Sequence, residues 1–349
     1  MKAGTANILR GLEINSESRT PKYKQVINFI INQIEKGKLV EGDRIPSINE
    51  TSEEFYLSRD TVEKAYSFLK DRNIIVSVKG KGYFVSNADL VSKVNVCLIF
   101  NKLSAYKKII FNAIIRTLDT NASVDLYVHH CDNELFKSIL RKKIGQYNYY
   151  AIMPHFQKMD DEMLKMIRSI PDDQLIIMDR KAPGLEGDYG SVYQNFKSDI
   201  YNALEAGLDS LKKYKKLVLV FPIDDMYPYP REIEQGFRTF CVAHKFEFDI
   251  IDEFSPDREI EQKGEAFIVI EDTDLVNLVK RVRSNRWTIG KDVGIVSYND
   301  TPLKEVLAEG ITVISTDFEK MGEQAARMIM DQDFRQVENP FSLIKRKSL

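Results

Sequence analysis

Two kinds of hydrophobic pattern follow each other along this 349-residue chain, and the change between them lies near residue 90. Before it, apolar residues recur at the spacing of one buried helix face, most clearly at Val62, Ala65, Tyr66 and Leu69. After it, apolar runs of strand length alternate with helical periods, as in βαβ units on a parallel sheet. The pattern predicts a small helical domain followed by a larger α/β domain.

The small domain is predicted to hold two short helices joined by a tight turn. Ser47 begins the first helix, with Glu50 three residues later at the spacing of a capping box. Ser58 caps the second helix and is followed by Arg59 and Thr61. Because a helix start offers free amides and a partial positive charge, these residues can contact phosphate, and a guanidinium there can reach a base edge. The second helix therefore has the features of a DNA recognition helix.

A hairpin is expected directly after these helices. Residues 74–78 and 83–85 have the composition of short strands, and Lys79-Gly80-Lys81-Gly82 joins them with glycines that tolerate positive φ. The two lysines at this tip suit a contact with phosphate or with the minor groove.

Residues 21–87 resemble the winged helix-turn-helix domain of the GntR superfamily. The resemblance rests on a lead-in helix at 23–36, the entry phrase at 42–47, the Ser-Arg-x-Thr-Val phrase at 58–62 and the wing at 79–85. It implies that operator DNA is contacted by Arg44, Ser47, Ser58, Arg59, Thr61, Lys79, Gly80 and Lys81. Asn49 and Glu63 stand where many members have arginine, which leaves the operator sequence open.

Charge limits how tightly one copy of this domain can bind. Residues 21–87 contain eleven Lys plus Arg and nine Asp plus Glu, so their net charge is only +2. Because affinity for DNA rises with the number of neutralised phosphates, we expect a homodimer on a two-fold operator.

The remaining composition excludes several classes of protein. Cys97, Cys131 and Cys241 are far apart and read as free thiols of a reducing compartment, with no metal site or cofactor. Residues 1–20 lack the apolar core of a signal peptide and are expected to be a flexible tail. No run of about 18 apolar residues is present, so we expect a cytoplasmic protein without a membrane contact, associated with the nucleoid when bound to DNA. Residues 88–93 are expected to be a short linker.

Residues 94–349 are predicted to form the α/β domain. Helices are expected at 107–117, 198–213, 233–244, 274–285 and 318–331. Strands are expected at 94–100, 123–129, 149–153, 174–178, 217–221, 246–250, 266–270, 293–297 and 312–315. Nine parallel strands exceed one ordinary sheet, so two lobes with a cleft between them fit better. Ligands of such sheets bind beyond the carboxyl ends of the strands.

This domain resembles the ligand-binding domain of LacI/GalR regulators and periplasmic sugar-binding proteins. The matching phrases lie at 176–180, 231–238, 296–302 and 340–346. The resemblance implies contacts with a sugar by Asn101, Tyr106, Arg180, Asn195, Arg231, Asp272, Asn299 and Asp300. An aromatic ring commonly covers the C–H surface of a bound sugar, and the candidates for it are Tyr106, Phe156, Tyr193 and Tyr227. Ile233 stands where many members have a clamping arginine, so the clamp is Arg231 or is absent.

The two resemblances together imply a sequence-specific transcription regulator of a sugar-utilisation operon, most simply a repressor. Its homodimer would hold operator DNA and be released by a pentose or deoxyhexose, with L-fucose as the first candidate. One alternative is a second domain that only dimerises or that binds a ligand other than a sugar. Another is an enzyme using Asp179 with Asp272 or Asp300, but the chain lacks a nucleophile elbow, a phosphate loop and a His-Glu-x-x-His motif. We therefore expect a protein that is not an enzyme.

Overall fold

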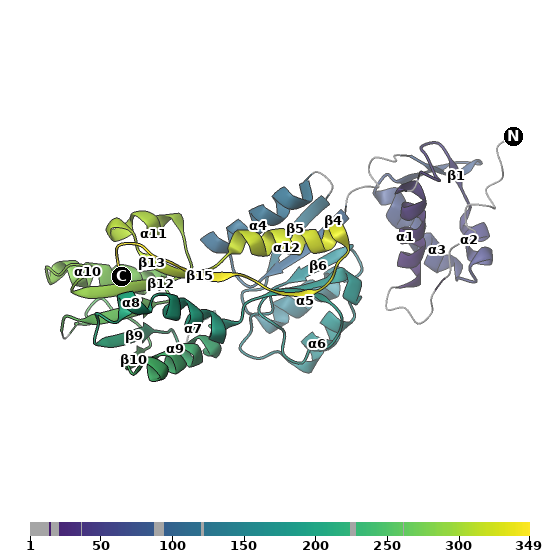
Figure 1. Ribbon diagram of the computed structural model, residues 1–349. Coiled ribbons are helices and arrows are strands. Elements are labelled where there is room, and N and C mark those ends of the chain that lie inside the picture. The colour runs from purple at the N-terminus through teal and green to yellow at the C-terminus, as the bar shows by residue number, and fades with distance from the viewer. Residues whose placement is uncertain are drawn as a thin grey trace.

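A small helical domain and two α/β lobes follow one another in the protein (Figure 1). The computed structural model describes residues 14, 21–35, 37–86, 94–119, 122–223, 228–260 and 262–349. The expected tail (1–20, apart from residue 14), the expected linker (88–93) and Tyr227 lie outside the described residues. None of the helices in the described ranges is long and apolar enough to cross a membrane.

The small domain is a three-helix unit with a three-stranded antiparallel sheet. Its elements are α1 (Lys22–Glu35), β1 (Arg44–Ile45), α2 (Ile48–Glu54), α3 (Arg59–Asp71), β2 (Ile75–Val78) and β3 (Gly82–Val85). The strands lie in the order β1-β3-β2. The apolar face predicted for α3 is buried against α1, and Val62, Ala65, Tyr66 and Leu69 all lie in the core of this domain. The helix-turn-helix and the hairpin predicted from the sequence are confirmed.

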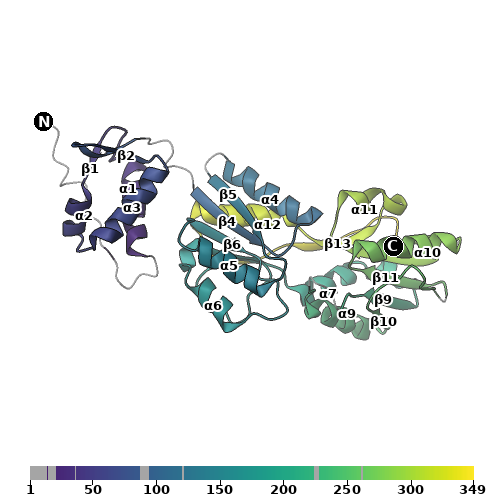
Figure 2. The same ribbon diagram turned by 180° about the vertical axis from the view of Figure 1, so that it is seen from behind.

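The first lobe is built on a fully parallel sheet in the order β14-β8-β7-β6-β4-β5. Its strands are β4 (Val94–Phe100), β5 (Ala122–Val128), β6 (Tyr149–Ile152), β7 (Leu175–Asp179), β8 (Gly190–Tyr193) and β14 (Gln336–Glu338). Its helices are α4 (Ala105–Leu118), α5 (Asn133–Lys143), α6 (Asp161–Arg168) and α12 (Phe318–Asp331). Helix α12 lies beside α4 in both views (Figures 1 and 2), because Gly322 lets the two backbones approach.

The second lobe has a sheet in the order β10-β9-β11-β12-β13-β15, in which only β15 is antiparallel to its neighbour. Its strands are β9 (Lys216–Val220), β10 (Glu247–Ile251), β11 (Glu265–Val269), β12 (Val293–Tyr298), β13 (Thr312–Thr316) and β15 (Phe341–Ile344). Its helices are α7 (Phe196–Ala206), α8 (Leu208–Leu211), α9 (Arg231–His244), α10 (Asp272–Ser284) and α11 (Pro302–Val306).

Two sheets of six strands replace the nine parallel strands expected from the sequence. The nine expected strands did not include β8, β14 or β15, which have three or four residues each. The expected helices did not include α5 and α6, in which charged residues are at least as many as apolar ones. The single helix expected at 198–213 is two helices, because the chain turns at Gly207. The prediction of two lobes is confirmed.

The chain crosses between the lobes three times, after β8, after β13 and after β14. Asn339 joins all three crossings: its backbone N–H donates to Tyr193 O (2.8 Å), and its Nδ2 donates to Thr316 Oγ1 (2.7 Å) and Asp317 O (2.9 Å). Its side chain is only 2% exposed. One asparagine thus ties together the three segments about which the lobes must move.

Candidate functional site

The entry to α2 carries the capping box that the sequence predicts. Ser47 Oγ accepts from Glu50 N (3.2 Å), and Glu50 Oε2 accepts from Ser47 N (2.6 Å). The hydrogen bonds with Ser47 hold the pKa of Glu50 below its usual value. Ser47 is therefore committed to the helix start while remaining half-buried beside the DNA-binding helices.

The start of α3 is open to solvent. Ser58 Oγ accepts from Thr61 N (3.3 Å) and lies 2.7 Å from Thr61 Oγ1, while Arg59 is exposed. Because the first four backbone N–H groups of a helix have no partner within the helix, an anion can be bound here. Arg59 is free to extend from this end of the recognition helix.

Helix α3 is held in place by a buried tyrosine. Tyr66 Oη donates to Pro46 O (2.7 Å) and lies 2.8 Å from Thr51 Oγ1. Burial raises the pKa of Tyr66 above its usual value. These bonds fix α3 against the entry of α2, which sets the angle of the helix-turn-helix.

The wing carries the remaining predicted contacts with DNA. Lys79, Gly80 and Lys81 are exposed, and Gly80 has φ +76°. Gly82 has φ +106°, and a Cβ there would lie 3.3 Å from Arg44 Nε, so Arg44 lies over the base of the wing. The eight residues that the GntR resemblance implies are thus all on this domain, at helix starts, on β1 and at the wing tip.

One exposed aromatic was not among the sequence-predicted contacts. Tyr56, in the turn between α2 and α3, is 96% exposed and has φ +52°. The sequence did carry a signal for Tyr56: it is an aromatic residue in the turn, outside the apolar positions that repeat along the helices.

Two small cavities lie between the lobes, where the carboxyl ends of their strands face each other. Their volumes are about 50 Å³ and about 130 Å³. Tyr106 on α4 and Asn299 after β12 line both cavities, Asn101 after β4 lines the smaller one, and Asp272 at the start of α10 lines the larger one. These four residues were predicted effector contacts, and the structure brings them together.

A buried ionic network forms the first-lobe wall of the smaller cavity. Asp179 accepts from Lys107 Nζ and Gln194 Nε2, and its Oδ2 lies 2.9 Å from His155 Nε2. Burial alone would raise the pKa of Asp179, but Lys107 and His155 outweigh it and hold that pKa well below its usual range. Burial lowers the pKa of His155. Both oxygens of Asp179 are therefore engaged, and the charges of Lys107 and Asp179 cancel.

The polar atoms left over at this cavity are mostly acceptors. Asn101 Oδ1, Gln194 Oε1 and Asn299 Oδ1 are buried without a hydrogen-bond partner, as is Tyr298 Oη. The orientation of Gln194 is fixed, because only its NH₂ group can donate to the Asp179 carboxylate. A buried acceptor without a partner is costly, so these atoms favour a ligand that supplies hydroxyl or amine donors.

The other predicted effector residues do not line these cavities. Arg180 lies 3.8 Å from Glu232, Arg231 lies 3.2 Å from Glu234, and Asn195 is exposed before α7. Asp300 accepts two bonds from Arg346 (2.9 and 2.8 Å).

Among the aromatic candidates, Tyr106 lines both cavities, and its ring is stacked on Phe318. Phe156 packs on His129 with 4.4 Å between ring centroids, and Lys181 Nζ lies 3.8 Å from the centre of the Tyr193 ring. Tyr106 is thus the aromatic of this group that the structure places at the cleft.

Three cavity residues were missed by sequence reasoning, namely Lys107, Gln194 and Lys304, whereas His155 was expected at a strand end and Tyr229 in a loop on the rim of the cleft. Lys107 gave a signal, because it occupies the apolar face of α4 together with Ile110 and Ile114. Tyr229 donates to Glu271, and Lys304 pairs with Asp272 (2.9 Å). Among the described residues no group of His, Cys, Asp or Glu is arranged to hold a metal ion.

Comparison with known proteins agrees with this architecture. Residues 22–85 match the model of the gntR family of bacterial regulatory proteins, and residues 211–349 match the periplasmic-binding-protein-like domain. The chain is 21% identical to the arabinose metabolism transcriptional repressor of Geobacillus stearothermophilus over 95% of this chain and 97% of that protein.

Other relatives match one domain only. The transcriptional repressor NagR of Bacillus subtilis is 37% identical over 22% of this chain and 31% of its own length. A dimeric Lac repressor structure is 17% identical, covers 73% of this chain and 98% of its own, and superposes with a TM-score of 0.59, which shows the shared fold. These relatives are regulators and not enzymes. The chain is therefore a transcription regulator that joins a DNA-binding domain of the gntR family to a periplasmic-binding-protein-like domain.

Proposed function

We propose that this regulator is a repressor of sugar-utilisation genes that a small neutral sugar, bound between the lobes, releases from its operator. The observation that carries the proposal is the set of buried amide oxygens without partners at the cleft, on the same chain as a DNA-reading domain. The relative that matches nearly the whole chain is a repressor of arabinose metabolism, which supports a sugar as the effector. The protein would act as a homodimer on chromosomal DNA in the cytoplasm.

The chemistry of the cleft favours an uncharged ligand. Asn101 Oδ1, Gln194 Oε1 and Asn299 Oδ1 can each accept from a hydroxyl group. Of the lysines that line the two cavities, Lys107 pairs with Asp179 and Lys304 with Asp272, while Lys102 Nζ lies 3.4 Å from the Tyr229 hydroxyl. To balance the charge of a phosphorylated sugar, Lys107 or Lys304 would have to leave its carboxylate partner, which is costly in a buried site. The small volumes of the two cavities favour a monosaccharide such as a pentose or deoxyhexose, with L-fucose and L-arabinose the first to test.

Release requires that the sugar bind one arrangement of the lobes better than the other, since equal affinity for both shifts no equilibrium. Closing the lobes on the sugar would move the first lobe, to which the DNA-binding domain is attached, relative to the partner's copy. A coupling of about 1–3 kcal/mol would change operator affinity by roughly 5–150-fold.

Gel-shift titrations of the full chain on its own promoter region test the proposal. We expect a retarded complex that L-fucose, L-arabinose or another neutral monosaccharide dissociates, while glucose 6-phosphate has no effect through the cleft. A complex that is equally stable with every neutral monosaccharide would refute the sugar response and leave a DNA-binding protein whose second domain only dimerises.

Matched variants locate the two activities. Arg59→Ala at the start of α3 is expected to weaken operator binding at least tenfold, whereas Lys70→Ala near the end of the same helix should change it much less.

Asn101→Ala and Asn299→Ala should each raise the sugar concentration needed for release, and the exposed Asn202→Ala should leave it unchanged. Equal effects of Asn101→Ala and Asn202→Ala would show that the sugar does not bind in the cleft.

A further inference from the structure

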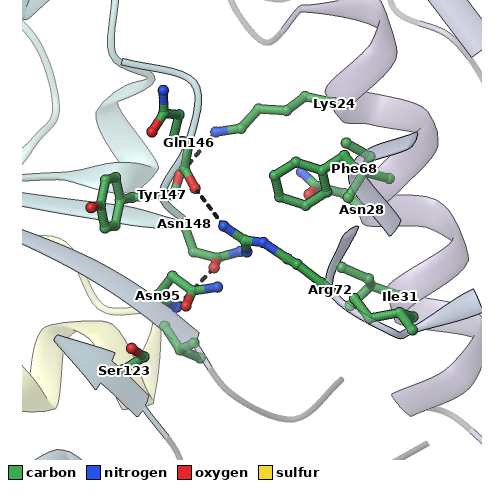
Figure 3. A pocket seen from close by; sticks show the side chains of 13 residues that line it. Lys24, Asn28, Ile31, Phe68, Arg72, Asn95, Ser123, Gln146, Tyr147 and Asn148 are labelled. Carbon is green, nitrogen blue, oxygen red and sulfur yellow. Dashed lines mark hydrogen bonds between the residues drawn. The ribbon is translucent and has the colours of Figure 1, made fainter. Parts of the chain in front are cut away.

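A third cavity lies where the DNA-binding domain meets the first lobe, at the opposite end of strands β4 and β6 from the cleft. Its volume is about 360 Å³. One wall comes from α1 and α3, and the other from the starts of β4 and β5 and from the loop before β6. Figure 3 shows Lys24 and Arg72 reaching from the helices of the DNA-binding domain toward Gln146, Tyr147 and Asn148 of this loop.

The two domains contact each other through these cations. Lys24 Nζ donates to Tyr147 O (2.8 Å), and Arg72 Nη2 donates to Gln146 O (3.5 Å). Both acceptors are neutral carbonyl groups. The described residues lining the cavity include no Asp or Glu, and the nearby Asp125 carboxylate accepts from Tyr147 Oη (2.5 Å). The cavity therefore holds two cations whose charge is not balanced within its lining.

The positive charges of Lys24 and Arg72 repel each other in this arrangement. Lys24 is 8% exposed, and burial followed by repulsion from Arg72 lowers the pKa of Lys24 to about 8. Burial also lowers the pKa of Arg72, although Tyr147 and the Asp125 carboxylate beyond the lining act to raise it. An anion between the two groups would remove the repulsion and make charge-assisted hydrogen bonds with both.

The other residues that line the cavity can contact the uncharged part of an organic anion. Asn148 Oδ1 accepts from Asn95 N (2.9 Å), which fixes the amide and leaves its Nδ2 as a donor. Ile27, Ile31 and Phe68 supply an apolar wall, and the Arg72 guanidinium lies 4.1 Å from the centre of the Phe68 ring. The cavity thus combines positive charge, an amide donor and a surface for a carbon skeleton.

We propose that this cavity is a second effector site, which binds a small organic phosphate with its anionic group between Lys24 and Arg72. Such a ligand contacts both domains at once and stabilises the orientation of the DNA-binding domain seen in the structure. Any difference in its affinity between this and other orientations must appear as a change in operator affinity. The regulator would then respond to a phosphorylated metabolite independently of the neutral sugar in the cleft.

Isothermal titration calorimetry of the full chain at low salt tests the site, with glucose 6-phosphate, fructose 1,6-bisphosphate, inorganic phosphate and glucose as probes. We expect saturable binding of a phosphate ester and none of glucose at this site, and at least tenfold weaker binding in Lys24→Met and Arg72→Gln. Lys22→Met is the matched control, because Lys22 is an exposed lysine on the same helix. Equal weakening by Lys22→Met, or no binding of either ester at 10 mM, would overturn the proposal.

Asn148→Asp separates loss of the site from loss of the fold. An aspartate can still accept from Asn95 N, and its charge would occupy the place of the anion between the two cations. We expect this variant to lose the phosphate ester while its unfolding temperature stays the same or rises. Unchanged ester binding in Asn148→Asp would refute the site. Release of DNA by neutral sugars is measured on the same variant. This separates loss of sugar binding in the cleft from loss of phosphate binding at the second effector site.

Discussion

His129 is held in its neutral form by two hydrogen bonds: one ring nitrogen donates and the other accepts. Its Nε2 lies 3.0 Å from Met153 O and must donate, while its Nδ1 accepts from Cys131 N (3.1 Å). A second proton on Nδ1 would face this N–H group. Burial accordingly lowers the pKa of His129 to about 4. The ring is a structural group of the first lobe, packed between Phe136 and Phe156.

This histidine predicts an acid-sensitive first lobe. Between pH about 6.5 and 4 the unfolded chain binds a proton at this residue and the folded chain does not. The contribution of neutral His129 to the free energy of unfolding should therefore be fully present above about pH 6.5 and should be lost as the pH is lowered toward 4. Urea unfolding at several pH values measures the slope, which should be smaller in His129→Leu; an equal slope in both proteins would contradict the assignment.

Lys107 and Asp179 make a second prediction at this scale. Removing one partner leaves the other as a buried charge, so Lys107→Met is expected to cost about 3–5 kcal/mol of unfolding free energy. The double variant Lys107→Met/Asp179→Asn should lose less than the single one, because no unpaired charge remains. A double-mutant cycle measures the coupling. Additive losses would show that the pair is not coupled in the folded protein.

Sequence alone predicted part of the cleft at this scale. Asn101 and Asn299 follow directly after strands and Asp272 follows three residues after β11. Because strand ends converge in an open sheet, their presence at the cavities was foreseeable. The partners of Asp179 were not, because Lys107, His155 and Gln194 come from three separate segments. Which charge pairs with which across a sheet is fixed by tertiary packing.

Helices and strands of the protein were predicted where their hydrophobic period was long. The face of α3 and the apolar runs of β7 and β12 are examples. Strand β14, Gln336–Glu338, has one partly buried apolar residue between two exposed polar ones. It is a strand because it pairs with β8, which no local pattern reveals.

The packing of α9 on α7 depends on a glycine and gives a prediction at this scale. A Cβ at Gly236 would lie 2.3 Å from Lys197 O and 2.5 Å from Ile200 Cγ2. Gly236→Ala should therefore push the helices apart and cost about 1–3 kcal/mol despite the higher helix propensity of alanine. Gln235→Ala, an exposed neighbour, should stay within about 0.5 kcal/mol of the parent. Thermal unfolding compares them, and a Gly236→Ala protein as stable as the parent would contradict this packing.

Movement of the two lobes is expected to depend on Asn339, because it binds all three crossings. Asn339→Ala should leave operator binding without sugar close to that of the parent but change the sugar-dependent difference in operator affinity by about 0.5–2 kcal/mol. Gel shifts with and without sugar measure this difference. Gln336→Ala, exposed on β14, is the control. The same response in both variants would show that the crossings are not coupled through this side chain.

Helix α12 and strand β14 have a consequence for synthesis of the protein. Both belong to the first lobe, yet they are encoded after nearly all of the second. The ribosome must translate roughly 145 residues beyond β8, for about 7–30 s at bacterial rates, before the first lobe can be completed. Until then Ile110 and Ile114 on α4 lack the helix that covers them. The nascent chain therefore exposes an apolar face to chaperones for most of its time on the ribosome, and slow codons within this stretch should lower the yield of folded protein.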